Sequence, residues 1–188
     1  FCIIPQIRGS QSSKPIDAVV EETRLLVEQG VREINLVAED TTGYGKDFGR
    51  DAARLPDLVE AMAQVDGLKW LRVMYAYPNN FPWRLTDVMN EYDNVLPYLD
   101  IPTQHIASPV LKSMLRGGNS SSVSEIMARL RREVPDIALR TTVLVGHPGE
   151  GRAEFKELLD WMQEFKFERL GAFAFSPEAN TPAGLDSN

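Results

Sequence analysis

Short apolar segments alternate with longer amphipathic segments along the whole chain, and this alternation restricts the fold more than any other feature. The apolar segments begin about 30 to 40 residues apart, the length of a unit made of one strand and one crossover helix. The predicted strands are residues 34–38, 70–75, 98–101, 138–145 and 169–175. The pattern therefore predicts an α/β fold with a parallel sheet.

The segments between the strands have apolar residues at helical spacing. The first predicted helix begins at Pro15, which suits a first helical turn, and ends at Gly30. Further helices are predicted near residues 56–62, 85–92, 109–116, 123–134 and 152–166. With an earlier strand expected just before Phe1, the five visible strands predict a six-unit, partly open parallel barrel whose first strand is missing upstream.

Composition narrows the class of protein. The chain has 188 residues and a formal net charge of −7, which argues against a free-standing nucleic-acid binder with a basic face. Its one cysteine, Cys2, forms no internal disulfide, so we expect a reducing compartment and place the protein in the cytoplasm. No apolar run approaches the roughly 20 residues that span a bilayer, so we expect no membrane association.

Reactive groups in parallel βα folds collect at the carboxyl ends of the strands. Glu39 and Asp40 follow the strand at 34–38, and Gln104 follows the strand at 98–101. Arg140 lies within the strand at 138–145, which leads into residues 146–150 with the string Gly-His-Pro-Gly-Glu. We expect these residues to share one end of the barrel.

Each of these features also has an ordinary structural explanation. A lone cysteine is more often a small buried apolar residue than a ligand. Gly146 and Gly149 suit a strand-to-helix turn, and Glu39 with Asp40 suits a solvated loop or a helix cap. His105 and His147 lack metal-ligand spacing to each other and to Cys2.

Taken together, several strings resemble the radical S-adenosylmethionine (SAM) methylthiotransferases. Phe1-Cys2-Ile3-Ile4-Pro5, with Arg8-Gly9, is similar to the end of the family's C-x-x-x-C-x-x-C loop. The strings that look like the RimO subgroup lie at 37–45, 72–75, 98–105, 140–142 and 170–173. That subgroup methylthiolates an aspartate of small-subunit ribosomal protein S12. The resemblance covers residues 1–188 as one radical-SAM core domain, a fragment without the family's amino-terminal and TRAM domains.

The resemblance implies a TIM-like radical SAM barrel with a 4Fe-4S cluster and bound SAM. Cys2 would be the third cluster ligand, with two cysteines expected upstream and a second cluster in the amino-terminal domain. The implied SAM-binding residues are Phe1, Glu39, Asp40, Gln104, Arg140, Gly146, Gly149 and Glu150. Among these, Arg140 would pair with the methionyl carboxylate, and Glu39 with Asp40 would engage the methionyl amino group.

The resemblance also implies ribosomal protein S12 as the substrate, a reductant such as flavodoxin or ferredoxin, and no direct nucleic-acid binding by this domain. With Cys2 alone, the 188 residues are expected to be inactive. The alternatives are the same chemistry on a tRNA adenosine, and a cluster-free βα scaffold that binds a partner. An aldolase-like barrel lacks support, because Lys69, the lysine nearest a strand, precedes Trp70 at the wrong end for a Schiff base.

Overall fold

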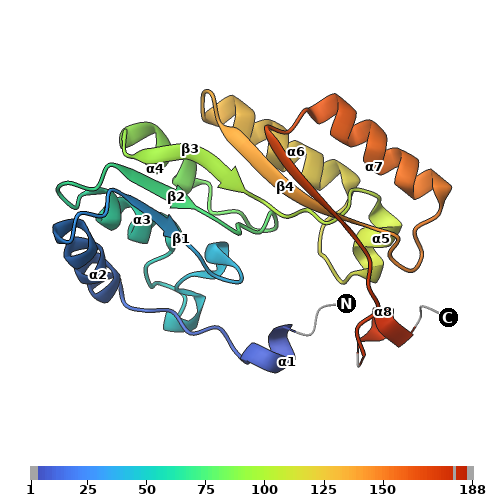
Figure 1. Cartoon of the computed structure of the whole chain (residues 1–188), viewed down its shortest axis with the longest axis horizontal. Coiled ribbons are helices and arrows are strands. Elements are labelled where there is room, and N and C mark those ends of the chain that lie inside the picture. Colours follow the sequence, from blue (N-terminus) through green and yellow to red (C-terminus); the bar gives the residue numbers. More distant parts are fainter. Residues whose placement is uncertain (1–3, 180, 186–188) are drawn as a thin grey trace.

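A computed structural model describes residues 4–179 and 181–185 and shows one five-stranded parallel sheet (Figure 1). The strands follow one another across the sheet in chain order. They are β1 (Glu33–Leu36), β2 (Trp70–Val73), β3 (Val95–Asp100), β4 (Ala138–Val145) and β5 (Arg169–Ala174). The five strands predicted from the apolar segments are confirmed.

The start of β3 differs from the prediction by three residues. The strand begins at Val95, which pairs with Leu71 of β2, whereas the sequence pattern placed its start at residue 98. Pro97 interrupts the apolar pattern, and it lies where the pairing of β2 and β3 shifts register. Proline has no N–H to donate to a sheet, and such irregularities are where a strand accommodates it.

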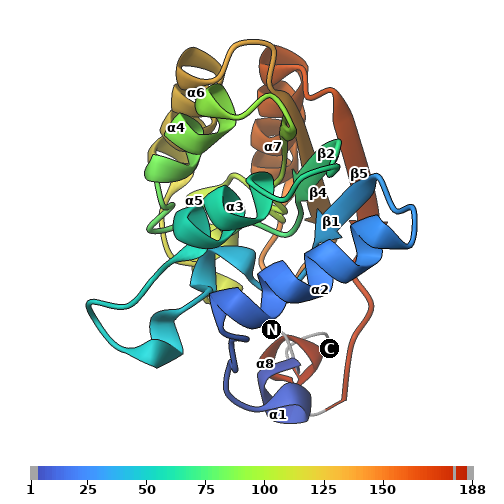
Figure 2. The same ribbon diagram turned by 90° about the vertical axis from the view of Figure 1, so that its left-hand side faces the viewer.

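Six helices of six or more residues connect or flank the strands, close to their predicted positions. They are α2 (Ile16–Glu28), α3 (Leu55–Ala63), α4 (Arg84–Glu91), α5 (Ser108–Ser113), α6 (Ser120–Glu133) and α7 (Arg152–Phe165). Because consecutive parallel strands are neighbours and crossovers are right-handed, the crossover helices fall on one face of the sheet (Figures 1 and 2). We call this the outer face and the opposite one the inner face.

Four short elements were not predicted. They are α1 (Ile4–Arg8), the 3₁₀ turns η1 (Thr41–Gly43) and η2 (Lys46–Phe48), and α8 (Pro182–Leu185). None is long enough to show two turns of apolar periodicity. Both α1 and α8 lie at the end of the molecule toward which the strands point (Figures 1 and 2).

The main core lies between the outer face and the helices. Leu71, Leu99, Leu139 and Val143, from three adjacent strands, are almost completely buried there. Their strand neighbours Arg72, Asp100 and Arg140 alternate to the inner face, as the period of two requires. The sheet therefore separates an apolar core from a charged face.

Candidate functional site

The loops that leave the carboxyl ends of the strands are tied together by backbone hydrogen bonds. Thr41 N–H donates to the Tyr75 carbonyl at 3.1 Å, and Gln104 N–H donates to the Thr142 carbonyl at 2.8 Å. Tyr75 and Gln104 both have left-handed backbone conformations, with φ of 54° and 67°. Such conformations cost on the order of 1–2 kcal/mol for side chains with a Cβ, and they concentrate at functional sites.

Glu39 and Asp40 follow β1 but differ in their surroundings. The Glu39 side chain is 57% exposed, and its Oε1 lies 3.6 Å from the Arg8 Nε. The Thr42 hydroxyl donates to Asp40 Oδ1 at 2.5 Å, at the start of η1. Asp40 is thus engaged within its own turn, whereas the Glu39 carboxylate reaches solvent beside the strand ends.

Asp100 and Arg140 form an ion pair on the inner face. The Arg140 Nη1 donates to Asp100 Oδ2 at 2.8 Å, and the two residues are register partners on β3 and β4. The Asp100 side chain is fully buried, and burial raises its carboxyl pKa, although Arg140 and the Tyr75 backbone amide partly offset that rise. Arg140 is 34% exposed, so part of its guanidinium remains accessible from the inner face.

The loop at residues 146–150 turns sharply after β4, with left-handed backbone at Gly146 and Gly149. The Gly146 N–H donates to the Glu150 carboxylate at 2.5 Å, and the Glu150 side chain is only 4% exposed. Its Oε1 lies 3.9 Å from the Nε2 of buried His105. Glu150 therefore closes its own loop, and the predicted glycine turn is confirmed.

His105, which has no metal-ligand spacing in the sequence, is buried beneath the loop 146–150 and lies close to Glu150. Its Nδ1 accepts a hydrogen bond from the Ala107 N–H at 3.0 Å, which leaves Nε2 as the protonated nitrogen of the neutral ring. Burial lowers the His105 pKa, while Glu150 acts in the opposite direction. This arrangement suits a neutral histidine that packs beside Glu150 and supports the loop 146–150.

The structure brings Glu39, Asp40, Gln104 and the loop 146–150 to the carboxyl end of the sheet, as the topology predicted. Arg140 instead lies near the start of β4, where it pairs with Asp100 at the end of β3. Phe1 and Cys2 lie outside the described residues, so their predicted roles stay predictions. Within 4–179 and 181–185 there is no group of three His, Cys, Asp or Glu side chains placed to hold a metal ion. Sequence reasoning did not single out Asp100, because its pairing with Arg140 depends on the register of β3 against β4.

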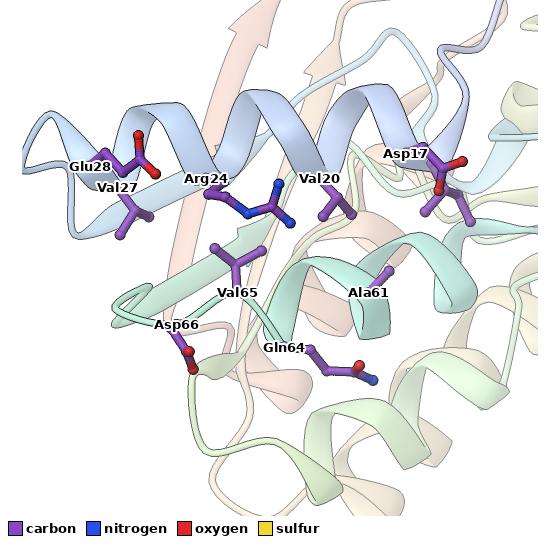
Figure 3. Close-up of a pocket in the computed structure, with 10 residues that line it drawn as sticks. Asp17, Val20, Arg24, Val27, Glu28, Ala61, Gln64, Val65 and Asp66 are labelled. Carbon is purple, nitrogen blue, oxygen red and sulfur yellow. The ribbon is translucent and has the colours of Figure 1, made fainter.

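A surface groove with a volume of about 620 Å³ lies elsewhere, between α2 and α3 (Figure 3). Val20, Val27 and Val65 contribute apolar surface, and Arg24 and Asp66 are among its charged residues. Figure 3 shows these side chains on the helical side of the sheet. The groove is thus separate from the strand ends where the candidate residues gather.

No helix in the described part of the chain combines the length and apolar character needed to cross a membrane.

Comparison with known proteins identifies the family. The model of the radical SAM superfamily matches residues 1–162. The ribosomal protein uS12 methylthiotransferase RimO of Geotalea uraniireducens is 46% identical over 97% of this chain and 41% of its own length. RimO of Parabacteroides distasonis is 48% identical over 97% of this chain and 42% of its own length. The chain thus spans about two fifths of these relatives, and the predicted resemblance to the RimO subgroup is confirmed.

Solved structures support the fold. The radical SAM methyltransferase TsrM from Kitasatospora setae has a TM-score of 0.71 and 18% identity, covering 92% of this chain and 33% of that one. Coproporphyrinogen III oxidase HemN from Escherichia coli has a TM-score of 0.65 and 11% identity, covering 91% of this chain and 40% of that one. Identities this low show the fold alone, and they confirm the predicted partial TIM-like barrel. Because the superfamily model matches most of its length, this chain belongs to the radical SAM superfamily.

Proposed function

We propose that this chain is the catalytic core of a ribosomal protein uS12 methylthiotransferase, which adds a methylthio group to the β-carbon of an aspartate. The observation that carries the proposal is the identity of 46% and 48% to two RimO proteins over nearly the whole chain. The proposed substrate is uS12, and the reductant is a small electron carrier of the flavodoxin or ferredoxin type. Direct nucleic-acid binding by this domain is not part of the proposal, and the proposed location is the cytoplasm.

The superfamily implies a 4Fe-4S cluster and SAM. In the proposal Cys2 is one of three cluster ligands, since thiolates are the usual ligands of iron-sulfur iron. A second cluster, in a part of the enzyme outside these residues, serves the sulfur transfer. The cluster and SAM together supply the radical that activates a substrate C–H bond. The 188 residues alone, with one cysteine, are proposed to be inactive.

The polar groups at the strand ends fit the methionyl part of SAM. Glu39 presents an exposed carboxylate that suits an ammonium group, and Arg140 uses one guanidinium nitrogen for Asp100 and keeps others for a carboxylate. In the proposal Asp40 engages the methionyl amino group together with Glu39, and Gln104 points into the same end of the barrel. Phe1 and the loop of Gly146, Gly149 and Glu150 contact the adenine.

Mass spectrometry of cells that lack the gene tests the function. We expect uS12 from such cells to lose its methylthio modification, while tRNA keeps its own. Complementation with the intact gene restores the modification, and complementation with Cys2→Ser does not, because a cluster ligand is lost.

The matched control for complementation is Arg24→Gln. Arg24 pairs with Glu21 on the outer helix α2, away from the strand ends, so we expect this variant to restore the modification of uS12. Loss of methylthio-adenosine from tRNA with uS12 unchanged would replace this proposal with the tRNA alternative. Full rescue by Cys2→Ser would instead support the cluster-free scaffold.

A further inference from the structure

Left-handed backbone conformations single out two residues at the carboxyl end of the sheet. Among the residues that the structure describes, six that are not glycine have a positive φ: Tyr75, Asn80, Gln104, Leu115, Asp136 and Lys166. Asparagine and aspartate adopt this conformation readily, and Leu115 and Lys166 lie at the ends of α5 and α7, where it is common. The remaining two, Tyr75 and Gln104, follow the adjacent strands β2 and β3.

Tyr75 lacks the usual reasons for such a conformation. The backbone changes partners at this turn, because the Tyr75 carbonyl accepts from the Thr41 N–H at 3.1 Å and the next N–H, of Ala76, donates to the Asp100 carbonyl at 2.8 Å. Glycine would make the same turn without strain, whereas a bulky side chain makes it at a cost. Within 4–179 and 181–185 no hydrogen bond, ion pair or ring contact engages the Tyr75 side chain, and the residue is 42% exposed. The side chain therefore adds little to the fold, which is typical of a residue that is kept for binding.

Backbone hydrogen bonds place Tyr75 between the groups that are proposed to bind the amino-acid end of SAM. Thr41, on one side, directly follows Asp40, which is assigned to the methionyl amino group. Asp100, on the other side, accepts a hydrogen bond at 2.8 Å from Arg140, which is assigned to the methionyl carboxylate. A methionyl group bound at both points therefore runs past the end of β2, where the exposed Tyr75 ring lies.

We propose that the Tyr75 ring binds the sulfonium of SAM through a cation–π contact. This inference rests on the proposed function, in which this end of the sheet binds SAM. The methionyl chain of SAM ends in a sulfonium, which carries a positive charge on its sulfur. The face of a tyrosine ring attracts cations, and the attraction grows where water is excluded. Tyr75 therefore favours SAM over its uncharged analogue S-adenosylhomocysteine, which has a neutral thioether in place of the sulfonium.

Equilibrium dialysis of the full-length holoenzyme, reconstituted anaerobically and kept without reductant, measures the affinities for SAM and for S-adenosylhomocysteine. The two ligands share their amino, carboxylate and adenosine groups and differ in one methyl group and in the charge on sulfur. The variants are Tyr75→Gly, which keeps the turn and removes the ring, and Tyr75→Phe, which keeps the ring. Lys166→Gly is the matched control, because it replaces a left-handed residue with φ of 55° just before β5, at the amino end of the sheet.

We expect Tyr75→Gly to weaken SAM binding about fivefold and S-adenosylhomocysteine binding at most about twofold, because only SAM carries the cation. Tyr75→Phe and Lys166→Gly should leave both affinities close to those of the wild type. The melting temperatures of both glycine variants should stay within about 3 °C of the wild type, since relief of strain offsets the freedom that glycine adds to the unfolded chain. The ratio of the two affinities is measured on folded protein, so it decides the question even if Tyr75→Gly is less stable.

Equal weakening of both ligands by Tyr75→Gly would overturn the inference, since the ring would then supply contact surface without regard to charge. Unchanged affinities for both ligands would overturn it as well and show that Tyr75 does not contact the cofactor. If Tyr75→Phe weakens SAM as much as Tyr75→Gly does, the hydroxyl and not the ring face makes the contact, and the inference fails.

The same preparations separate this inference from the proposed function. If the wild-type holoenzyme binds SAM but leaves uS12 unmodified, the proposed function fails, and the affinity ratio in Tyr75→Gly still decides the inference. If the wild-type holoenzyme binds no SAM, both fail together. Modification of uS12 by the wild type, with an unchanged affinity ratio in Tyr75→Gly, defeats the inference alone.

Discussion

The two faces of the sheet differ in what their side chains contact, although they are built from the same strands. On the outer face Leu99 and Leu139 are buried against the helices. One residue further along each strand, Asp100 and Arg140 pair with each other on the inner face. The inner face also leaves large apolar groups accessible, such as Phe173, which is 61% exposed.

This difference assigns separate tasks to alternate residues. Outer-face residues gain stability from apolar burial, which is the main favourable contribution to folding. Inner-face residues keep polar donors and acceptors accessible, which binding requires and folding does not. Mutations on the two faces should therefore have different consequences even when they affect adjacent positions.

The largest expected effect is on the outer face. Leu99→Ala should lower the free energy of unfolding by about 3 kcal/mol, because it removes buried methyl groups and leaves a cavity. Phe173→Ala is the matched inner-face truncation, and it should change the unfolding free energy by about 0.5 kcal/mol or less, as for other exposed positions. Urea unfolding followed by circular dichroism measures both.

Similar losses for Leu99→Ala and Phe173→Ala would contradict the contrast between the faces. They would mean that the inner face is also packed in solution, against something that protects Phe173 from water.

The second effect is electrostatic and comes from Asp100, whose side chain is completely buried on the inner face. Because the folded-state pKa of Asp100 is raised, the folded protein holds a proton at pH values where the unfolded chain has released it. The contribution of Asp100 to stability is therefore greatest at pH values below the ordinary carboxyl pKa. It decreases as the pH rises through the raised pKa of the folded state. The stability difference between wild type and Asp100→Asn should fall as the pH increases.

Urea unfolding at a series of pH values from about 4 to 8 measures this difference. Asp66→Asn is the control, since it removes a carboxylate that is exposed after α3. A stability difference that grows with pH for Asp100→Asn would mean that the attraction of Arg140 outweighs burial.

The sequence predicted the outer face better than the inner one. Apolar periodicity locates strands and crossover helices because burial acts on every second or every third to fourth residue. It also placed Glu39, Gln104 and the loop 146–150 at one end of the sheet, since parallel strands share a direction. Arg140 was expected at the same end but lies near the start of β4.

Pairings across the inner face could not be predicted in the same way. The contact of Asp100 with Arg140 depends on the register of β3 against β4. The neighbouring pairing of β2 with β3 is irregular near Pro97, and a sequence pattern does not reveal such a shift. Likewise, Arg169 is one charged residue among many in the sequence, and only the register of β4 against β5 pairs it with Arg140.

The smallest expected effect concerns the other inner-face ion pair, Glu33 with Arg72. Both side chains are about one-third exposed, so solvent screens the attraction, and pairs of this kind contribute about 0.5 kcal/mol. Arg72→Gln should cost slightly more than Glu33→Gln, because it also removes the stacking on Tyr98. A double-mutant cycle in urea should give a coupling energy below about 1 kcal/mol that shrinks at high salt. A larger, salt-insensitive coupling would show that the inner face contributes to stability as the outer face does, which would remove the distinction between them.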